Sequence, residues 1–151
     1  MSRGARKISK KALKGDPKFG SPMLAKFINY VMLNGKKTVA QNIVYTALEQ
    51  ASKDIKKPPM QIFEEAIRNV QPQVEVRSRR VGGANYQVPM PVRGERQNSL
   101  AFRWIIGAAR AKKGQPMALK LAAVLVDSFN NTGDAVRKRD DMHRMADANK
   151  A

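Results

Sequence analysis

Apolar residues recur at helical spacing soon after residue 20. Four of them occupy positions i, i+3, i+4 and i+7, which form one face of an α-helix: Leu24, Phe27, Ile28 and Val31. Ser21 is suited to cap this helix, and Pro22 suits its first position because proline lacks the N–H that would be unpaired there. The pair Asn34-Gly35 then favours a left-handed stop.

Similar apolar stripes predict three more helices. Their expected core positions are Ala40, Ile43, Val44, Ala47, Leu48 and Ala51, then Phe63, Ala66, Ile67 and Val70, then Leu100, Ala101, Trp104, Ile105 and Ala108. Thr38 and Gln41 have the spacing of a capping box for the second helix, with the alternative that Lys36-Lys37 already lie in that helix. Pro59 can open the third helix. The fourth helix should run from about Arg93 to Lys112. A fifth, from Pro116 to Phe129, is apolar almost all round and should therefore be central.

The last predicted helix, at about 134–149, is highly charged. Its opposite charges at i, i+4 spacing are the pairs Arg137/Asp141 and Asp140/Arg144. It also carries His143, the only histidine, among acids that could in principle assist a metal ion or a proton transfer. The surrounding arginines favour a solvated, salt-bridged surface instead. With no nucleotide or catalytic motif elsewhere, we expect no enzyme activity, no metal, no cofactor and no small-molecule substrate.

A β-hairpin is predicted at about 73–91. Residues alternate between apolar and polar on either side of Gly82-Gly83, and a glycine pair of this kind is typical of a tight turn. Pro89 and Pro91 cannot donate to a ladder, so the hairpin should have free edges. The expected fold is mainly α, a single domain of about six helices with a protruding two-stranded β-hairpin. The alternative is a hairpin that lies flat on its own core with solvated arginines.

Charge narrows the class of partner. The chain carries 29 lysines and arginines against 12 acids, a net charge of +17 over 151 residues. An excess of this size favours binding to nucleic acid. No apolar run approaches the ~18 residues of a membrane-spanning helix, and the first residues lack the apolar stretch of a secretory signal. Cysteine is absent, which excludes disulfides. We therefore expect a cytoplasmic protein with no membrane partner.

The first 18 residues form a basic arm, and residues 19–151 form the helical domain. The arm has one acid, Asp16, and seven basic residues: Arg3, Arg6, Lys7, Lys10, Lys11, Lys14 and Lys18. Segments of this composition commonly become ordered on nucleic acid. A merely solubilising tail is the alternative.

Three further basic elements accompany the arm. They are Lys36-Lys37 at a helix junction, the hairpin arginines, and Arg96, Arg103 and Arg110, which recur every seventh residue away from the apolar face of the fourth helix. The aromatic residues are mostly required by the core, so recognition should depend on shape and phosphate, as is usual for folded RNA. An architectural DNA-bending protein and a helical scaffold for acidic proteins remain alternatives, and competition between folded RNA and duplex DNA separates them.

Four segments together resemble the small-subunit ribosomal protein seven family. They are residues 16–37, 74–84, 100–105 and 138–149. The resemblance implies a structural constituent of the small ribosomal subunit. It further implies a protein that binds the three-prime major domain of small-subunit rRNA, nucleates head assembly and lies near the exit-site tRNA and mRNA. Small-subunit proteins nine and eleven would be neighbours. Bacterial members commonly continue with a short aromatic and basic segment where this sequence ends at Ala151. The contacts that this segment makes in those members are therefore not carried over to this chain.

Site residues are carried over onto matching positions. The resemblance implies that rRNA phosphates are held by the arm and by Lys36, Lys37, Arg77, Arg79, Arg93, Arg96, Arg103 and Arg110. It also implies that the tRNA and mRNA path is faced by Arg80, Gly82, Gly83, Ala84, Asn85 and Arg144.

Overall fold

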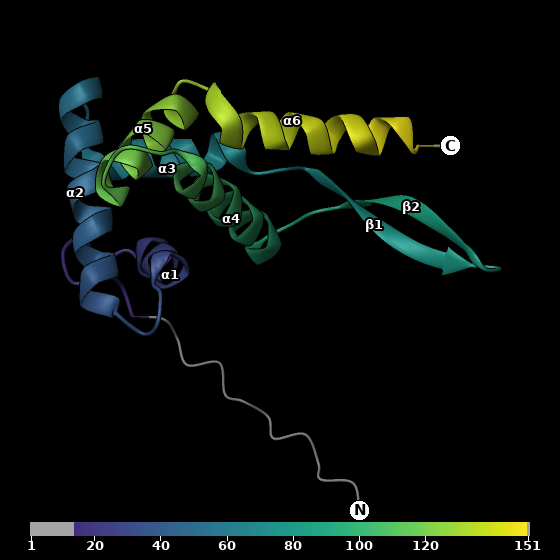
Figure 1. The fold of residues 1–151 in the computed structure, drawn as a ribbon, viewed down its shortest axis with the longest axis horizontal. Coiled ribbons are helices and arrows are strands. Elements are labelled where there is room, and N and C mark those ends of the chain that lie inside the picture. Colours follow the sequence, from purple (N-terminus) through teal and green to yellow (C-terminus); the bar gives the residue numbers. More distant parts are fainter. Residues whose placement is uncertain (1–13, 151) are drawn as a thin grey trace, which may run out of the picture.

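The computed structural model describes residues 14–150. These residues form six helices and one two-stranded antiparallel sheet, which confirms the expected fold class. The elements in chain order are α1 (Pro22–Val31), α2 (Lys37–Ile55), α3 (Pro59–Val70), β1 (Val74–Val81), β2 (Ala84–Pro91), α4 (Glu95–Ala111), α5 (Met117–Phe129) and α6 (Gly133–Ala148). Figure 1 shows the helices gathered in one body, from which the hairpin and the end of α6 extend on the same side.

The core lies where α5 meets the other helices. α5 contacts α2, α3, α4 and α6, so the prediction of a central fifth helix is confirmed. Phe27, Phe63 and Phe102 are completely buried and pack ring against ring, with centroids 5.2–6.4 Å apart. Aromatic contacts of this kind join α1, α3 and α4 across the core.

The predicted core face of α4 is wrong in part. Phe102, Ile106 and Ala109 are buried, whereas Trp104 and Ala108 are only partly buried. The helix carries apolar residues around most of its circumference between positions 100 and 109, so periodicity alone could not choose its buried side. The buried side of α4 is determined by its packing against α1, α3 and α5.

Two of the predicted helix starts are confirmed, and two other local predictions for the helices are not. Ser21 Oγ accepts a hydrogen bond from the Leu24 N–H at 3.2 Å, and Pro59 opens α3, both as predicted. The capping box does not form, because α2 begins at Lys37 and Thr38 is already inside it, which agrees with the alternative start at Lys36-Lys37. The predicted i, i+4 ion pairs of α6 are wrong. The carboxylates of this helix instead pair with arginines one or three positions away in the sequence: Arg137–Asp134, Arg139–Asp140 and Arg144–Asp141.

A buried carboxylate fixes the turn that precedes α1. Asp16 is 4% exposed and accepts hydrogen bonds from the N–H groups of Lys18, Phe19 and Ser21 at 2.7–3.1 Å. Tyr45 of α2 donates its hydroxyl to the same carboxylate at 3.0 Å. Burial acts to raise the pKa of Asp16, but these hydrogen bonds outweigh it and lower the pKa. The end of the predicted basic arm therefore packs on the domain.

The hairpin projects beyond the helices (Figure 1). Its strands pair in register from Val74 opposite Pro91 to Val81 opposite Ala84, which leaves Gly82-Gly83 as a two-residue turn. Both glycines have positive φ, 57° and 83°, as a type I′ turn requires. The prediction of a glycine-rich turn is confirmed. α6 lies alongside the hairpin and contacts both strands. The residues of the outer half of both strands are exposed, so the hairpin does not lie flat on the core.

Candidate nucleic-acid interface

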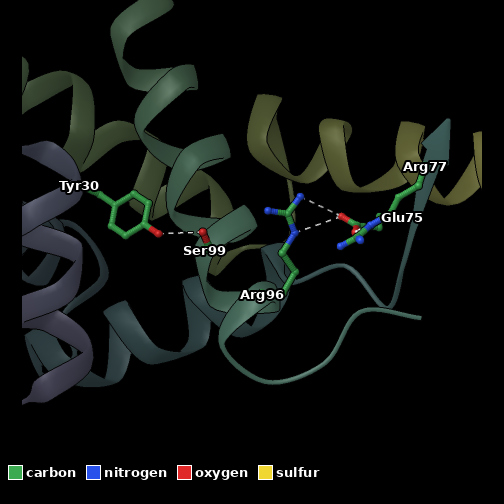
Figure 2. A network of polar contacts seen from close by, with 5 residues as sticks. All are labelled: Tyr30, Glu75, Arg77, Arg96 and Ser99. Atoms are coloured by element: carbon green, nitrogen blue, oxygen red, sulfur yellow. Dashed lines mark hydrogen bonds and ion pairs between the residues drawn. The ribbon is translucent and has the colours of Figure 1, made fainter. Parts of the chain in front are cut away.

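The base of the hairpin is joined to α4 by a buried carboxylate. Glu75 is 4% exposed and accepts hydrogen bonds from Arg77 Nε at 2.7 Å and from Arg96 Nε and a terminal guanidinium nitrogen at 3.3 and 3.2 Å. Figure 2 shows the guanidinium groups of both arginines converging on this carboxylate. Glu75 thus fixes two of the predicted phosphate-binding arginines within one cluster.

The same cluster controls the ionisation of Glu75. Burial acts to raise the pKa of this carboxyl group, but the hydrogen bonds and charges of Arg77 and Arg96 outweigh burial and lower the pKa. The carboxylate is therefore ionised at neutral pH. The arginine side chains remain 59% and 42% exposed, so each keeps donor groups that face solvent.

The outer half of the hairpin carries its arginines on opposite faces. Because side chains alternate along a strand, Arg77 and Arg79 share one face and Arg80 lies on the other. Arg79 lines an open recess of about 590 Å³ between the hairpin and the end of α6, which also includes Tyr86 and Lys150. All three arginines are exposed. The strand geometry thus separates Arg80 from the other two arginines.

On α4, two of the three predicted arginines have no carboxylate partner within the described residues. Arg103 and Arg110 are exposed, away from the buried face of the helix, and make no ion pair in residues 14–150. Arg96 differs because Glu75 holds it. Arg93, in the segment before α4, is also exposed. The predicted stripe is therefore exposed throughout, and its first member belongs to the Glu75 cluster.

The predicted lysine elements lie around α1 and α2. Lys36 is the residue before α2 and Lys37 is its first residue; both are exposed and make no ion pair within residues 14–150. Lys18 instead contacts Glu49 at 3.3 Å and lies 5.4 Å from the centre of the Tyr45 ring. Lys14 is exposed. The other five predicted arm residues lie outside the described residues: Arg3, Arg6, Lys7, Lys10 and Lys11.

The residues predicted to face tRNA and mRNA divide between the hairpin and α6. Gly82, Gly83, Ala84 and Asn85 form the exposed tip. Arg144 is on the outer surface of α6, with a side chain 79% exposed and 3.4 Å from Asp141. α6 contacts both strands, and this helix and the hairpin extend on the same side of the helical body (Figure 1).

His143 has a structural role that sequence reasoning missed. Its Nε2 accepts a hydrogen bond from the Gln73 N–H at 3.1 Å, directly before β1. It thereby ties α6 to the base of the hairpin. Between residues 14 and 150 no group of three or more histidine, cysteine or acidic side chains could hold a metal ion.

Glu75 and Asp16 were also not identified as site residues. Glu75 occupies a polar position in an alternating strand, where an exposed side chain is the ordinary expectation. Asp16 is followed by Pro17, which is typical of a turn, and that was the only available signal. The local sequence around Glu75 and Asp16 does not indicate that either carboxylate is buried.

A compact helical domain with a projecting basic hairpin and unpaired arginines on a neighbouring helix is typical of proteins that bind a structured polyanion such as RNA. No helix in residues 14–150 is both long and apolar enough to cross a membrane. The chain belongs to the family described as "Ribosomal protein S7p/S5e", whose profile matches residues 3–150.

Individual relatives match over nearly their whole length, and each is described as "Small ribosomal subunit protein uS7". The protein from Novosphingobium aromaticivorans is 56% identical over 151 residues, which cover 100% of this chain and 96% of the relative. The protein from Thermotoga maritima is 53% identical over 97% of this chain and 94% of its own. The protein from Psychromonas ingrahamii is 57% identical over 90% of this chain and 87% of its own length. The chain is thus a structural, non-enzymatic component of the small ribosomal subunit.

Proposed function

We propose that this protein is a primary rRNA-binding protein that holds the three-prime major domain of small-subunit rRNA and nucleates assembly of the subunit head. The observation that carries this proposal is the pair of exposed arginines on α4, Arg103 and Arg110, which no described carboxylate neutralises. Arginine is suited to bind phosphate because its guanidinium group donates parallel hydrogen bonds. The Glu75 cluster at the base of the hairpin and the exposed pair Lys36-Lys37 at the start of α2 supply further cations.

The hairpin tip and Arg144 form a second part of the proposal. They would lie near exit-site tRNA and mRNA, because the tip projects away from the core and has the conformational freedom of Gly82-Gly83. A loop of this kind can approach another backbone closely. Small-subunit proteins nine and eleven are the proposed protein neighbours. The family resemblance, rather than a contact in the described residues, supports both of these assignments.

A competition experiment tests the rRNA assignment. Labelled rRNA of the three-prime major domain is bound by the protein and challenged with unlabelled rRNA or duplex DNA across a range of salt concentrations. We expect rRNA to compete far better than DNA. If about six to ten phosphates are contacted, the logarithm of affinity should fall against the logarithm of salt with a slope of about −4 to −9.

Two results would contradict the proposal. Equal competition by duplex DNA would favour an architectural DNA-binding protein, which recognises deformable duplexes with little sequence preference. A slope near zero would remove phosphate contacts as the source of affinity.

A further inference from the structure

A small cavity lies between the turn before α1, the middle of α1 and the start of α2. It measures about 220 Å³ and is lined by the turn residues Lys14, Gly15, Asp16 and Pro17, by Ala25, Ile28 and Asn29 of α1, and by Lys37 and Gln41 of α2. This volume is below the ~300 Å³ at which pockets for drug-sized molecules begin. It is suited to one planar ring system with its substituents.

The lining separates apolar and polar groups. Pro17 and Ala25 supply the accessible apolar surface, since Ile28 is only 1% exposed, and the side-chain amides of Asn29 and Gln41 make no hydrogen bond within residues 14–150. An amide has two donors and two acceptor lone pairs, so both side chains can pair with the edge of a heterocycle. Asn and Gln pair bidentately with adenine in duplexes, and the Watson–Crick edge of an unpaired adenine offers them the same arrangement of one donor beside one acceptor. A bare phosphate would use neither the amide acceptors nor the apolar surface.

Two exposed lysines and one buried carboxylate, Asp16, line the cavity, so the charge that a ligand meets at its mouth is positive. Lys14 and Lys37 are exposed at its lining, and Lys37 begins α2, where the positive end of a helix dipole adds to the charge. A nucleotide whose base entered the cavity would bring phosphates within reach of these two lysines. An uncharged ligand would gain nothing from them.

The wall of the cavity is preorganised. The carboxylate of Asp16 fixes the turn through three backbone N–H groups and the Tyr45 hydroxyl. Gly15 also packs so closely on Gly20 that an added Cβ would lie 2.3 Å from the Gly20 carbonyl oxygen. Binding therefore does not require this segment to become ordered first, which reduces its cost.

We propose that this cavity is a reading pocket for a single unpaired nucleotide of the bound RNA, with the base between the apolar wall and the amides of Asn29 and Gln41. Sequence-specific RNA recognition generally uses bases that are splayed out of loops and bulges. This inference rests on the proposed rRNA-binding function and assigns a base-reading site to a surface that otherwise would bind only phosphate.

The test compares two double variants in binding to rRNA of the three-prime major domain. Asn29→Ala with Gln41→Ala should lower affinity about ten- to a hundredfold and leave the salt slope unchanged, because no charge is removed. Lys14→Ala with Lys37→Ala should lower the slope by about 0.7 to 0.9 for each lysine. The matched control, Asn42→Ala with Gln61→Ala, removes two amides outside the cavity and should bind like the wild type.

Chemical probing identifies the base. Wild-type protein should shield the Watson–Crick edge of one nucleotide from dimethyl sulfate, and the amide variant should expose it again. Unchanged affinity and unchanged probing for the amide variant would overturn the pocket. Circular dichroism checks the fold, and the single variants Asn29→Ser and Gln41→Ser, each with a partial loss of affinity, test the pocket if the double variant is destabilised.

A further variant separates failure of the pocket from failure of the proposed function. Arg103→Ala with Arg110→Ala removes phosphate contacts on α4, far from the amides in sequence. If this variant loses affinity while the amide variant does not, only the pocket is wrong. If neither loses affinity, the proposed rRNA interface itself is wrong.

Discussion

Replacing Glu75 by glutamine should destabilise the protein at neutral pH. The substitution keeps the shape of the side chain and removes the charge that faces Arg77 and Arg96. The Glu75 side chain is 6% exposed, so water cannot replace the lost contacts at that end. The two arginines would then remain close together without the anion between them.

The size of the effect follows from the exposure of the arginines. Hydrogen bonds to charged groups contribute ~1.5–3 kcal/mol, whereas exposed ion pairs contribute ~0–1 kcal/mol. The side chains of Arg77 and Arg96 are 59% and 42% exposed, so solvent screens both charges. The effect should therefore lie where the two ranges approach each other, near the top of the range for exposed ion pairs. We expect a loss of about 1 kcal/mol in the free energy of unfolding, or about 2–4 °C in Tm for a domain of this size.

The effect should depend on pH with a definite sign. The pKa of Glu75 is lowered in the folded protein, so its contribution is complete above the pKa of the unfolded chain, about 4.3. The contribution is lost as the pH falls through the folded pKa. The difference between wild type and variant should therefore be constant from pH 7 to about pH 5 and should shrink at lower pH.

Urea unfolding followed by circular dichroism measures this difference at each pH. Glu95→Gln is the matched control, because Glu95 is 81% exposed and lies 4.0 Å from Lys26, so it should change stability by less than about 0.5 kcal/mol. Equal effects of the two substitutions, or a Glu75→Gln effect that persists unchanged at pH 3, would refute the electrostatic role of Glu75.

The other predictions concern the tip, the turn before α1 and α4. Replacing residues 80–85 by Asn-Gly should leave Tm nearly unchanged, because these residues are exposed, while altering tRNA retention in reconstituted subunits; a large fall in Tm would contradict a purely functional tip. Asp16→Asn should cost about 1–3 kcal/mol in urea unfolding, with the cost disappearing in acid because the pKa of Asp16 is lowered, and Asp54→Asn at an exposed site serves as control. Replacing Arg103 and Arg110 by alanine should flatten the salt slope of rRNA binding by about 1.4 to 1.8 without loss of helicity; an unchanged slope would exclude both contacts.

Helix positions were predictable because their signals are local. The spacing of Leu24, Phe27, Ile28 and Val31 and the cap at Ser21 depend on residues within about two turns of one another, and the structure confirms both. The glycine turn of the hairpin is local in the same sense. The exposure of Arg103 also follows from periodicity, since the residue stands off the apolar face.

Contacts between distant segments were not predictable from the sequence. Glu75 meets Arg96 across 21 positions, and Asp16 meets Tyr45 across 29. Nothing in either local pattern distinguishes these carboxylates from acids that remain in solvent. The core side of α4 was misjudged for the same reason, because the choice between Phe102 and Trp104 depends on which helices arrive on each side.

The few acids of this basic chain determine which of its cations stay free. Glu75 takes Arg77 and Arg96 at the base of the hairpin, and Asp134, Asp140 and Asp141 bind the arginines of α6. By contrast, Arg103 and Arg110 on α4 and the pair Lys36-Lys37 at the start of α2 meet no described carboxylate. A phosphate approaching them need not displace an internal partner, whereas one approaching the Glu75 cluster meets arginines already fixed in place. The distribution of acids thus separates cations that orient the hairpin from cations that are available to bind RNA.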